Sequence, residues 1–206
     1  FYETEIDRWH RRTVHGYVIE GRTPAAGVKE AVALSDSDND GLWTAMYGAG
    51  ECFAYAATGA AVARRRAEQA WQALRTLGTV TQGGHSAAEP GFLARSVLPA
   101  ADGDPNQGSY TLAGDEAKRQ SGDRLWKSLS PRWPRSADGQ WYWKADTSSD
   151  ELDGHFFFYG RYYDLVARDG EERDQIRAHA CALMDHLLRH DFCLVDHDGT
   201  PTRWGV

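Results

Sequence analysis

The feature that most limits the possible folds is an order of segments that occurs twice. Each half of the chain begins with polar residues, continues with a helix-length apolar block and an amphipathic helix, and closes with a loop that contains an arginine. The first copy covers 41–98 and its loop contains Arg95, and the second covers 150–205 and its loop contains Arg203. Two such copies predict two helical hairpins, because self-similar segments form repeated supersecondary units.

The two helices of each predicted hairpin differ in the distribution of their apolar residues. The block 41–59 is apolar or small on nearly all sides, whereas 60–77 and 171–190 are one-sided. The apolar face of the first one-sided helix consists of Ala67, Ala70, Trp71, Leu74 and Leu77. The second should carry His179 and His186 at the surface. We therefore predict an all-α fold with little β structure, with buried inner helices and an outer layer in water.

The residues between the hairpins, 100–149, show little periodicity and are rich in Gly, Pro, Asp, Ser and Trp. A connection of this length inside a compact domain is usually functional or disordered. Its tryptophans favour a long ordered loop. Trp133, Trp141 and Trp143 are candidates for stacking against sugar rings, or they form a small core beneath the loop.

Length and charge narrow the classes of function. The 206 residues suffice for a single domain, 1–206, with one core. The net charge of −7, without a dominant basic cluster, argues against a nucleic-acid partner. No apolar stretch approaches the length of a membrane span, and no signal peptide is present. Since the chain begins at Phe1 rather than Met and stops at Val206, we expect a fragment of a larger protein. The sequence does not indicate the oligomeric state.

Three stretches carry a resemblance to known proteins: SDNDGLWTAMYGAGECFAYAATG (37–59), WYWKADTSSDELDGH (141–155) and DHDGTPTRWG (196–205). With them the sequence resembles the α/α-toroid carbohydrate-active proteins, which include the six-hairpin glycosidases and related polysaccharide lyases. More narrowly, it resembles a group of secreted bacterial proteins of undescribed function. The resemblance covers most of 35–206.

The resemblance implies a fold and a place for the ligand. The two hairpins would form part of an incomplete ring, whose inner helices begin at the end where toroids bind glycans. The starts of the inner helices, 38–43 and 150–155, would then face one cleft, and the substrate would be a carbohydrate. An extracellular or periplasmic location is also implied.

An acidic run, SDSDNDG (35–41), precedes the first apolar block. Asp36, Asp38 and Asp40 match the first half of a calcium loop, but the twelfth position, which needs a bidentate carboxylate, is Tyr47. These aspartates are therefore weak candidates for binding calcium, and no other cofactor is predicted. The alternatives are a cap for the following helix, or a catalytic or sugar-binding carboxylate.

A second acidic run, KADTSSDELDGH (144–155), precedes the second apolar block. Its last ten residues contain five titratable residues: Asp146, Asp150, Glu151, Asp153 and His155. A capping box of Ser148 and Glu151 explains only part of this set. Glycoside hydrolysis needs two carboxyl groups across the scissile bond. The natural pairing is Asp40 with Asp150 or Glu151, one from each helix start.

Aromatic and basic residues allow a different chemistry. His155, Tyr159 and Tyr163 recur at helical spacing and form one stripe, which either packs in the core or carries protons. A lyase acting on a uronate needs a base, an acid and a group that neutralises the carboxylate. His155 and Tyr159 could transfer the protons, and Arg95 or Arg203 could bind the carboxylate.

The sequence therefore predicts an enzyme that cleaves a polysaccharide or oligosaccharide, either by hydrolysis with paired carboxylates or by β-elimination. The expected substrate-binding residues are Trp43, Arg95, Trp141, Trp143, Arg203 and Trp204. A toroid that binds glycans or acts as a scaffold without turnover is the alternative, because a fold does not determine chemistry. The sugar and its linkage stay open.

Overall fold

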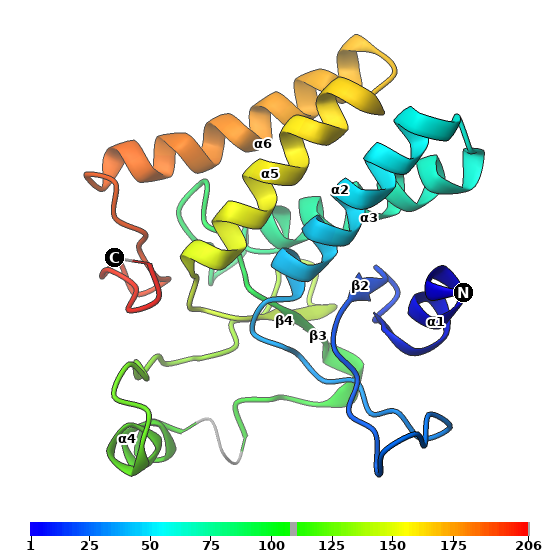
Figure 1. Cartoon of the computed structure of the whole chain (residues 1–206). Helices are drawn as coiled ribbons and strands as arrows, with labels where there is room; N and C mark the ends of the chain where they lie inside the picture. Colours follow the sequence, from blue (N-terminus) through cyan, green and yellow to red (C-terminus); the bar gives the residue numbers. More distant parts are fainter. Residues whose placement is uncertain (108–110, 206) are drawn as a thin grey trace.

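Six helices dominate the regular structure of the computed structural model, which describes residues 1–107 and 111–205 (Figure 1). These are α1 (Tyr2–Trp9), α2 (Asp40–Thr58), α3 (Ala61–Thr79), α4 (Leu112–Ser121), α5 (Ser149–Leu165) and α6 (Gly170–Arg189). Two antiparallel pairs join β1 (Arg11–Arg12) to β2 (Tyr17–Val18) and β3 (Val97–Pro99) to β4 (Trp141–Trp143), and η1 (Ala100–Asp102) is a 3-10 turn. The described chain is thus mostly helical, as predicted. None of its helices combines the length and apolar character needed to cross a membrane.

The helices of both predicted hairpins form where the sequence places them. In the first hairpin α2 ends at Gly59, whose φ of 68° is left-handed and whose N–H donates to the Tyr55 carbonyl at 2.8 Å. Glycine adopts this conformation without the clash that a Cβ would cause. In the second hairpin Asp169 caps α6 by accepting the Glu172 N–H at 2.9 Å.

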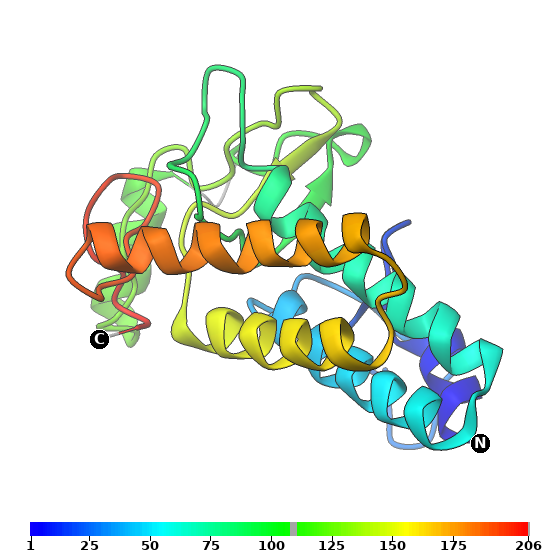
Figure 2. The same cartoon turned by 90° about the horizontal axis from the view of Figure 1, so that it is seen from above.

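The two inner helices, α2 and α5, lie side by side, with α3 against α2 and α6 along α5 (Figures 1 and 2). Glycines permit this close approach. A Cβ on Gly48 would meet the Ala70 Cβ of α3 and the Phe158 Cε2 of α5, both at 2.6 Å. A Cβ on Gly154 would meet the Leu42 Cα at 2.9 Å. The small residues that weaken α2 as an isolated helix therefore allow it to contact two neighbours at once.

The core between the helices is aromatic. Trp71 of α3 stacks on Tyr162 of α5 with ring centroids 5.9 Å apart, and Leu74, Leu77 and Phe158 are also fully buried. The apolar face predicted for the helix at 60–77 is therefore the face of α3 that is buried in the core. Burying each such side chain contributes about 1.5–3 kcal/mol, which outweighs the weak propensity of the glycine-containing helices.

Two expectations about burial are wrong. Trp43, Met46 and Phe53 of α2 are each 46–49% exposed, because α3 and α5 cover only part of this apolar helix. His186 of α6 is only 2% exposed, although the pattern places it at the surface. The segment that follows α6 returns over this histidine, and the Val195 N–H donates to His186 Nε2 at 3.4 Å.

The segment 100–149 is more than a loop. It contains α4 and β4, while 108–110 lie outside the described residues. Helical periodicity could not reveal α4, because its one buried residue is an acid, Asp115. Asp115 accepts hydrogen bonds from Trp126 Nε1 at 2.9 Å and from the Leu129 N–H at 3.2 Å. Polar contacts therefore hold α4 in place.

Candidate functional site

The starts of α2 and α5 meet at one end of the helical layer (Figure 1). Glu151 Oε1 accepts a hydrogen bond from the Leu42 N–H at 3.3 Å, and Asn39 Nδ2 donates to Asp150 Oδ2 at 3.4 Å. The segments 38–43 and 150–155 are therefore neighbours in space.

Glu151 caps the neighbouring helix instead of its own. The Ser148 Oγ accepts the Glu151 N–H at 3.4 Å, which is one half of the predicted capping box. The Glu151 carboxyl reaches across to α2, whose N-cap, Asn39, makes no side-chain cap bond among the described residues. Glu151 is fully buried, and its Oε2 has no hydrogen-bond partner within the described chain. Burial raises the pKa of this carboxyl well above its usual range.

Asp40 is also fully buried, and both of its oxygens are engaged. Its Oδ1 accepts from the Ser37 N–H at 3.0 Å and from the Ser37 Oγ at 2.9 Å. Its Oδ2 accepts from the Ser96 Oγ at 2.8 Å and forms an ion pair with Arg12. Because Arg12 also donates to the Val97 carbonyl at 2.8 Å, Asp40 joins α2 to β1 and β3.

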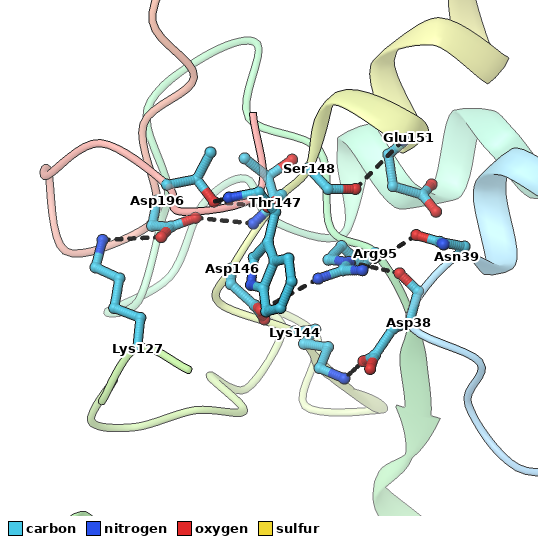
Figure 3. A network of polar contacts seen from close by, with 12 residues as sticks. Asp38, Asn39, Arg95, Lys127, Lys144, Asp146, Thr147, Ser148, Glu151 and Asp196 are labelled. Atoms are coloured by element: carbon cyan, nitrogen blue, oxygen red, sulfur yellow. Dashed lines mark hydrogen bonds and ion pairs between the residues drawn. The ribbon is translucent and has the colours of Figure 1, made fainter. Parts of the chain in front are cut away.

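Asp36 and Asp38 both bind a cation that belongs to the chain itself. The Lys144 Nζ lies 3.2 Å from Asp36 Oδ2 and forms a second ion pair with Asp38 (Figure 3). Asp38 has a left-handed φ of 66°, which turns its carboxylate towards Lys144 while its carbonyl accepts from Arg95. An ammonium thus lies beside the carboxylates that resemble half of a calcium loop.

Arg95 is buried at the centre of this network (Figure 3). Its Nη1 donates to Asp146 at 3.4 Å and its Nη2 to Asn39 Oδ1 at 3.1 Å. Its guanidinium also lies 5.8 Å from the centre of the Trp204 ring. Arg203, by contrast, is exposed and donates to the carbonyls of Arg124 and Trp126, in the segment that follows α4. The two arginines predicted to share a role thus contact different parts of the chain.

His155 and Tyr159 lie on the same face of α5 as Glu151, each one helical turn further along the helix. They are 0% and 2% exposed, and their rings lie 5.5 Å apart. Neither ring nitrogen of His155, nor the Tyr159 hydroxyl, has a hydrogen-bond partner among the described residues. Burial, with a smaller contribution from the charge of His179, lowers the pKa of His155 to about 3, and burial raises that of Tyr159. Both side chains are therefore neutral at pH 7. Tyr163 is only partly buried.

The predicted sugar-stacking tryptophans fall into two groups. Trp133 and Trp143 are buried in the core, and Trp143 packs against Phe92 with ring centroids 5.7 Å apart. Trp141 is partly exposed but lies against His15, with ring centroids 4.7 Å apart. Trp43, in the first turn of α2, and Trp204, beside Arg95, remain at the helix starts with part of their surface exposed.

Several residues at the site were not predicted. Lys144 and Arg12 supply the contacts that neutralise the acidic run. Asp196 accepts the Thr147 N–H at 2.9 Å and pairs with Lys127 at 2.8 Å, which holds the segment before α5 (Figure 3). The one usable signal was Lys144 itself, a lone cation between the aromatic and acidic parts of WYWKADTSSD.

The functional groups that reach the surface at the starts of α2 and α5 are carboxylates, an amide and an indole. Asp150 is exposed, Asp38 and Asn39 are partly exposed, and Trp43 is close to Asp38 and Asn39 in sequence. Carboxylate and amide groups bind hydroxyls, and an indole packs against flat apolar faces, so this surface suits a ligand rich in hydroxyl groups. Comparison of the sequence with models of protein families, with curated proteins and with solved structures gave no match.

Proposed function

We propose that the chain is part of an α/α-toroid protein that acts on carbohydrate, and that the surface around the starts of α2 and α5 binds the glycan. The observation that carries this proposal is the hydrogen bond from the Leu42 N–H to Glu151, which ties the two helix starts together. Neighbouring inner helices that begin at one end are what a toroid requires. The proposal includes the extracellular or periplasmic location implied by the resemblance.

An incomplete ring fits the uncovered surfaces of the hairpins. Met46 and Phe53 form an exposed apolar surface on α2, further along the helix than Trp43. A groove of about 430 Å³ between α5 and α6 is lined by Phe156, Tyr159, Gly160, Tyr163, Ile176, Arg177 and Ala180. Further hairpins packed on these two flanks would bury apolar surface that now faces water. In this arrangement α2 and α5 belong to the inner ring, and α3 and α6 to the outer ring.

Of the two chemistries, hydrolysis has more support than elimination. Asp150 is exposed at the start of α5, where a sugar could reach its carboxylate, and the partly exposed Asp38 is the second carboxylate. His155 and Tyr159, which elimination would use, lie beneath them and are buried. In this proposal Asp150 reacts, while Asp40 and Glu151 position the two helix starts. Calcium is not needed, because Lys144 neutralises Asp36 and Asp38.

A glycan-binding or scaffold toroid without turnover is the second candidate. The full burial of Asp40 and Glu151 favours it, because two of the three carboxyl groups expected to react make structural contacts instead. In that case the exposed Trp43 and Asn39 would matter for binding, and Asp150 could be neutralised without loss of affinity.

The test is a screen of the protein against neutral and uronic-acid glycans, with assays for new reducing ends and for unsaturated products. We expect reducing ends with a neutral glycan, at least a 100-fold loss of rate in Asp150→Asn, roughly the size of one catalytic acid–base contribution, and little change in Asp164→Asn. Asp164 is exposed near the other end of α5 and serves as the matched control.

The outcomes separate the candidates. Unsaturated products would replace hydrolysis by elimination. Glycan binding that Trp43→Ala weakens, with no product formed, would favour the scaffold. No binding to any glycan would contradict both forms of the proposal.

A further inference from the structure

A cluster of potential metal ligands lies away from the helix starts, where the loop between α3 and β3 meets the last turn of α6. It consists of Glu89, His186 and His190, and one donor atom of each lies within 4.8 Å of the others. Glu89 Oε2 lies 2.5 Å from His190 Nε2 and 3.8 Å from His186 Nδ1. The two imidazole rings are 4.9 Å apart. Three donor atoms from two distant segments therefore converge on one point.

His186 is the buried part of the cluster. Its side chain is 2% exposed, and Nδ1, the nitrogen that faces Glu89, has no hydrogen-bond partner among the described residues. Burial lowers the pKa of His186, so its ring is neutral at pH 7 and has a lone pair available. A buried polar atom without a partner is uncommon and calls for an explanation such as an ion.

The remaining contacts leave the carboxylate ready to act as a ligand. Arg189 binds the other oxygen, Oε1, at 2.8 Å, and Oε2 faces the two histidines. The hydrogen bond from His190 and the pairing with Arg189 lower the pKa of Glu89, so the carboxylate is ionised at neutral pH. Gly91 brings the loop close to α6, since a Cβ there would lie 2.0 Å from the Ala182 carbonyl oxygen.

We propose that Glu89, His186 and His190 bind a zinc ion that ties the loop between α3 and β3 to the end of α6. Two histidines four residues apart, one in the last turn of α6 and one at its C-cap, together with one carboxylate match a common zinc ligand set, with the fourth position open to water. Tetrahedral zinc places neighbouring ligand atoms roughly 3.3 Å apart. Glu89 and His190, whose side chains are 39% and 28% exposed, can adjust to that spacing around the fixed His186.

Zinc at Nδ1 has a consequence for the other nitrogen of His186. The Val195 N–H now points at Nε2 from 3.4 Å, a long hydrogen bond. When Nδ1 binds the metal, the ring proton moves to Nε2, and the Val195 N–H loses its acceptor. The Val195 amide therefore reports zinc binding although it does not contact the ion.

The experiment is calorimetric titration of Zn²⁺ into the untagged, chelator-treated chain, with Glu89→Gln and His190→Ala as variants and His85→Ala as control. His85 is exposed on the same loop but outside the cluster. We expect one zinc per chain and an increase in Kd of about tenfold or more in each variant, since losing a ligand costs at least as much as losing a residue that orients one. His85→Ala should bind as the parent does, and zinc should shift the Val195 amide signal in NMR spectra.

Glu89 and His190 are partly exposed, so their variants are expected to fold, which circular dichroism will check. Absence of zinc binding by the parent chain would overturn the proposal. So would equal binding by the parent, Glu89→Gln and His190→Ala. Loss of binding in His85→Ala would show that a different set of ligands holds the metal.

Discussion

Glu151, His155 and Tyr159 form a line of polar groups inside the helical core, and each has an atom without a hydrogen-bond partner among the described residues. Burial of such atoms costs about 1–3 kcal/mol each. Glu151 recovers part of this cost by capping α2. Of the three residues, Glu151 is therefore the one whose polar contact ties the start of α5 to α2.

The raised pKa of Glu151 gives a prediction for stability. In the unfolded chain this group titrates near 4.5, and in the folded chain at higher pH. Between the two values the folded state binds more protons, so ionisation lowers the free energy of unfolding as pH rises. Glu151→Gln keeps an acceptor for the Leu42 N–H but cannot ionise. We expect the variant's stability relative to the parent to grow by up to about 1.4 kcal/mol per pH unit above pH 4.5.

Urea unfolding of both proteins at a series of pH values measures this difference. Glu171→Gln, at an exposed position of α6, controls for the loss of one negative charge. A difference for Glu151→Gln that stays constant with pH, or matches that of Glu171→Gln, would contradict the raised pKa.

Among the elements, α2 contacts both α3 and α5 at Gly48. A Cβ at Gly48 would lie 2.6 Å from atoms of both α3 and α5, whereas a Cβ at Gly50 would meet no atom of the described residues within 4 Å. Gly48→Ala should therefore lower the free energy of unfolding by about 1–3 kcal/mol through overpacking. Gly50→Ala should raise it by about 0.5–1 kcal/mol through helix propensity. Thermal unfolding of the two variants compares them, and equal effects would mean that the helices are not in close contact at Gly48.

Helices with an apolar pattern could be predicted from the sequence, and those held by polar contacts could not. Apolar periodicity and the Gly59 cap were enough to place α2 and α3 almost to the residue. The same signal is missing from α4, whose buried group is Asp115. The periodicity of apolar residues indicates which face of a helix is buried. It does not indicate which charged residue of another segment will pair with a buried acid such as Asp115.

The candidate site was predictable only in part for the same reason. Ser148 as a cap follows from its neighbours in sequence, and the structure contains that cap. The partner of Asp36 and Asp38 is Lys144, more than one hundred positions along the chain, and Glu151 likewise caps a helix from the other hairpin. Such pairs depend on how the hairpins pack, which no local motif specifies.

At the scale of the whole molecule, a chain of ion pairs joins the helix starts to α4. Arg95 pairs with Asp146 at 3.4 Å, and Arg132 lies 3.6 Å from Asp146 and 3.4 Å from Asp115. Arg132 is 1% exposed. Arg132→Leu would leave two buried carboxylates with one neutralising partner fewer. We expect a loss of about 3–5 kcal/mol in the free energy of unfolding, and faster amide hydrogen exchange in α4.

Arg135→Leu is the matched control, because Arg135 is exposed on the same segment, its side chain donates to the nearby Gly139 carbonyl, and its guanidinium lies 5.9 Å from the centre of the Tyr142 ring. Its effect should stay below about 1 kcal/mol. If Arg132→Leu costs no more than Arg135→Leu, or leaves exchange in α4 unchanged, the ion pairs do not connect these parts.

The capping of α5 also sets an order of events during synthesis. The Ser149 N–H and the Ser149 Oγ both donate to the Trp204 carbonyl, at 3.0 and 3.1 Å, and the Thr147 N–H donates to Asp196. A ribosome makes the start of α5 well before it makes these acceptors. The first hairpin can therefore form on the emerging chain, whereas the junction between the hairpins is completed only after residue 204 has left the exit tunnel.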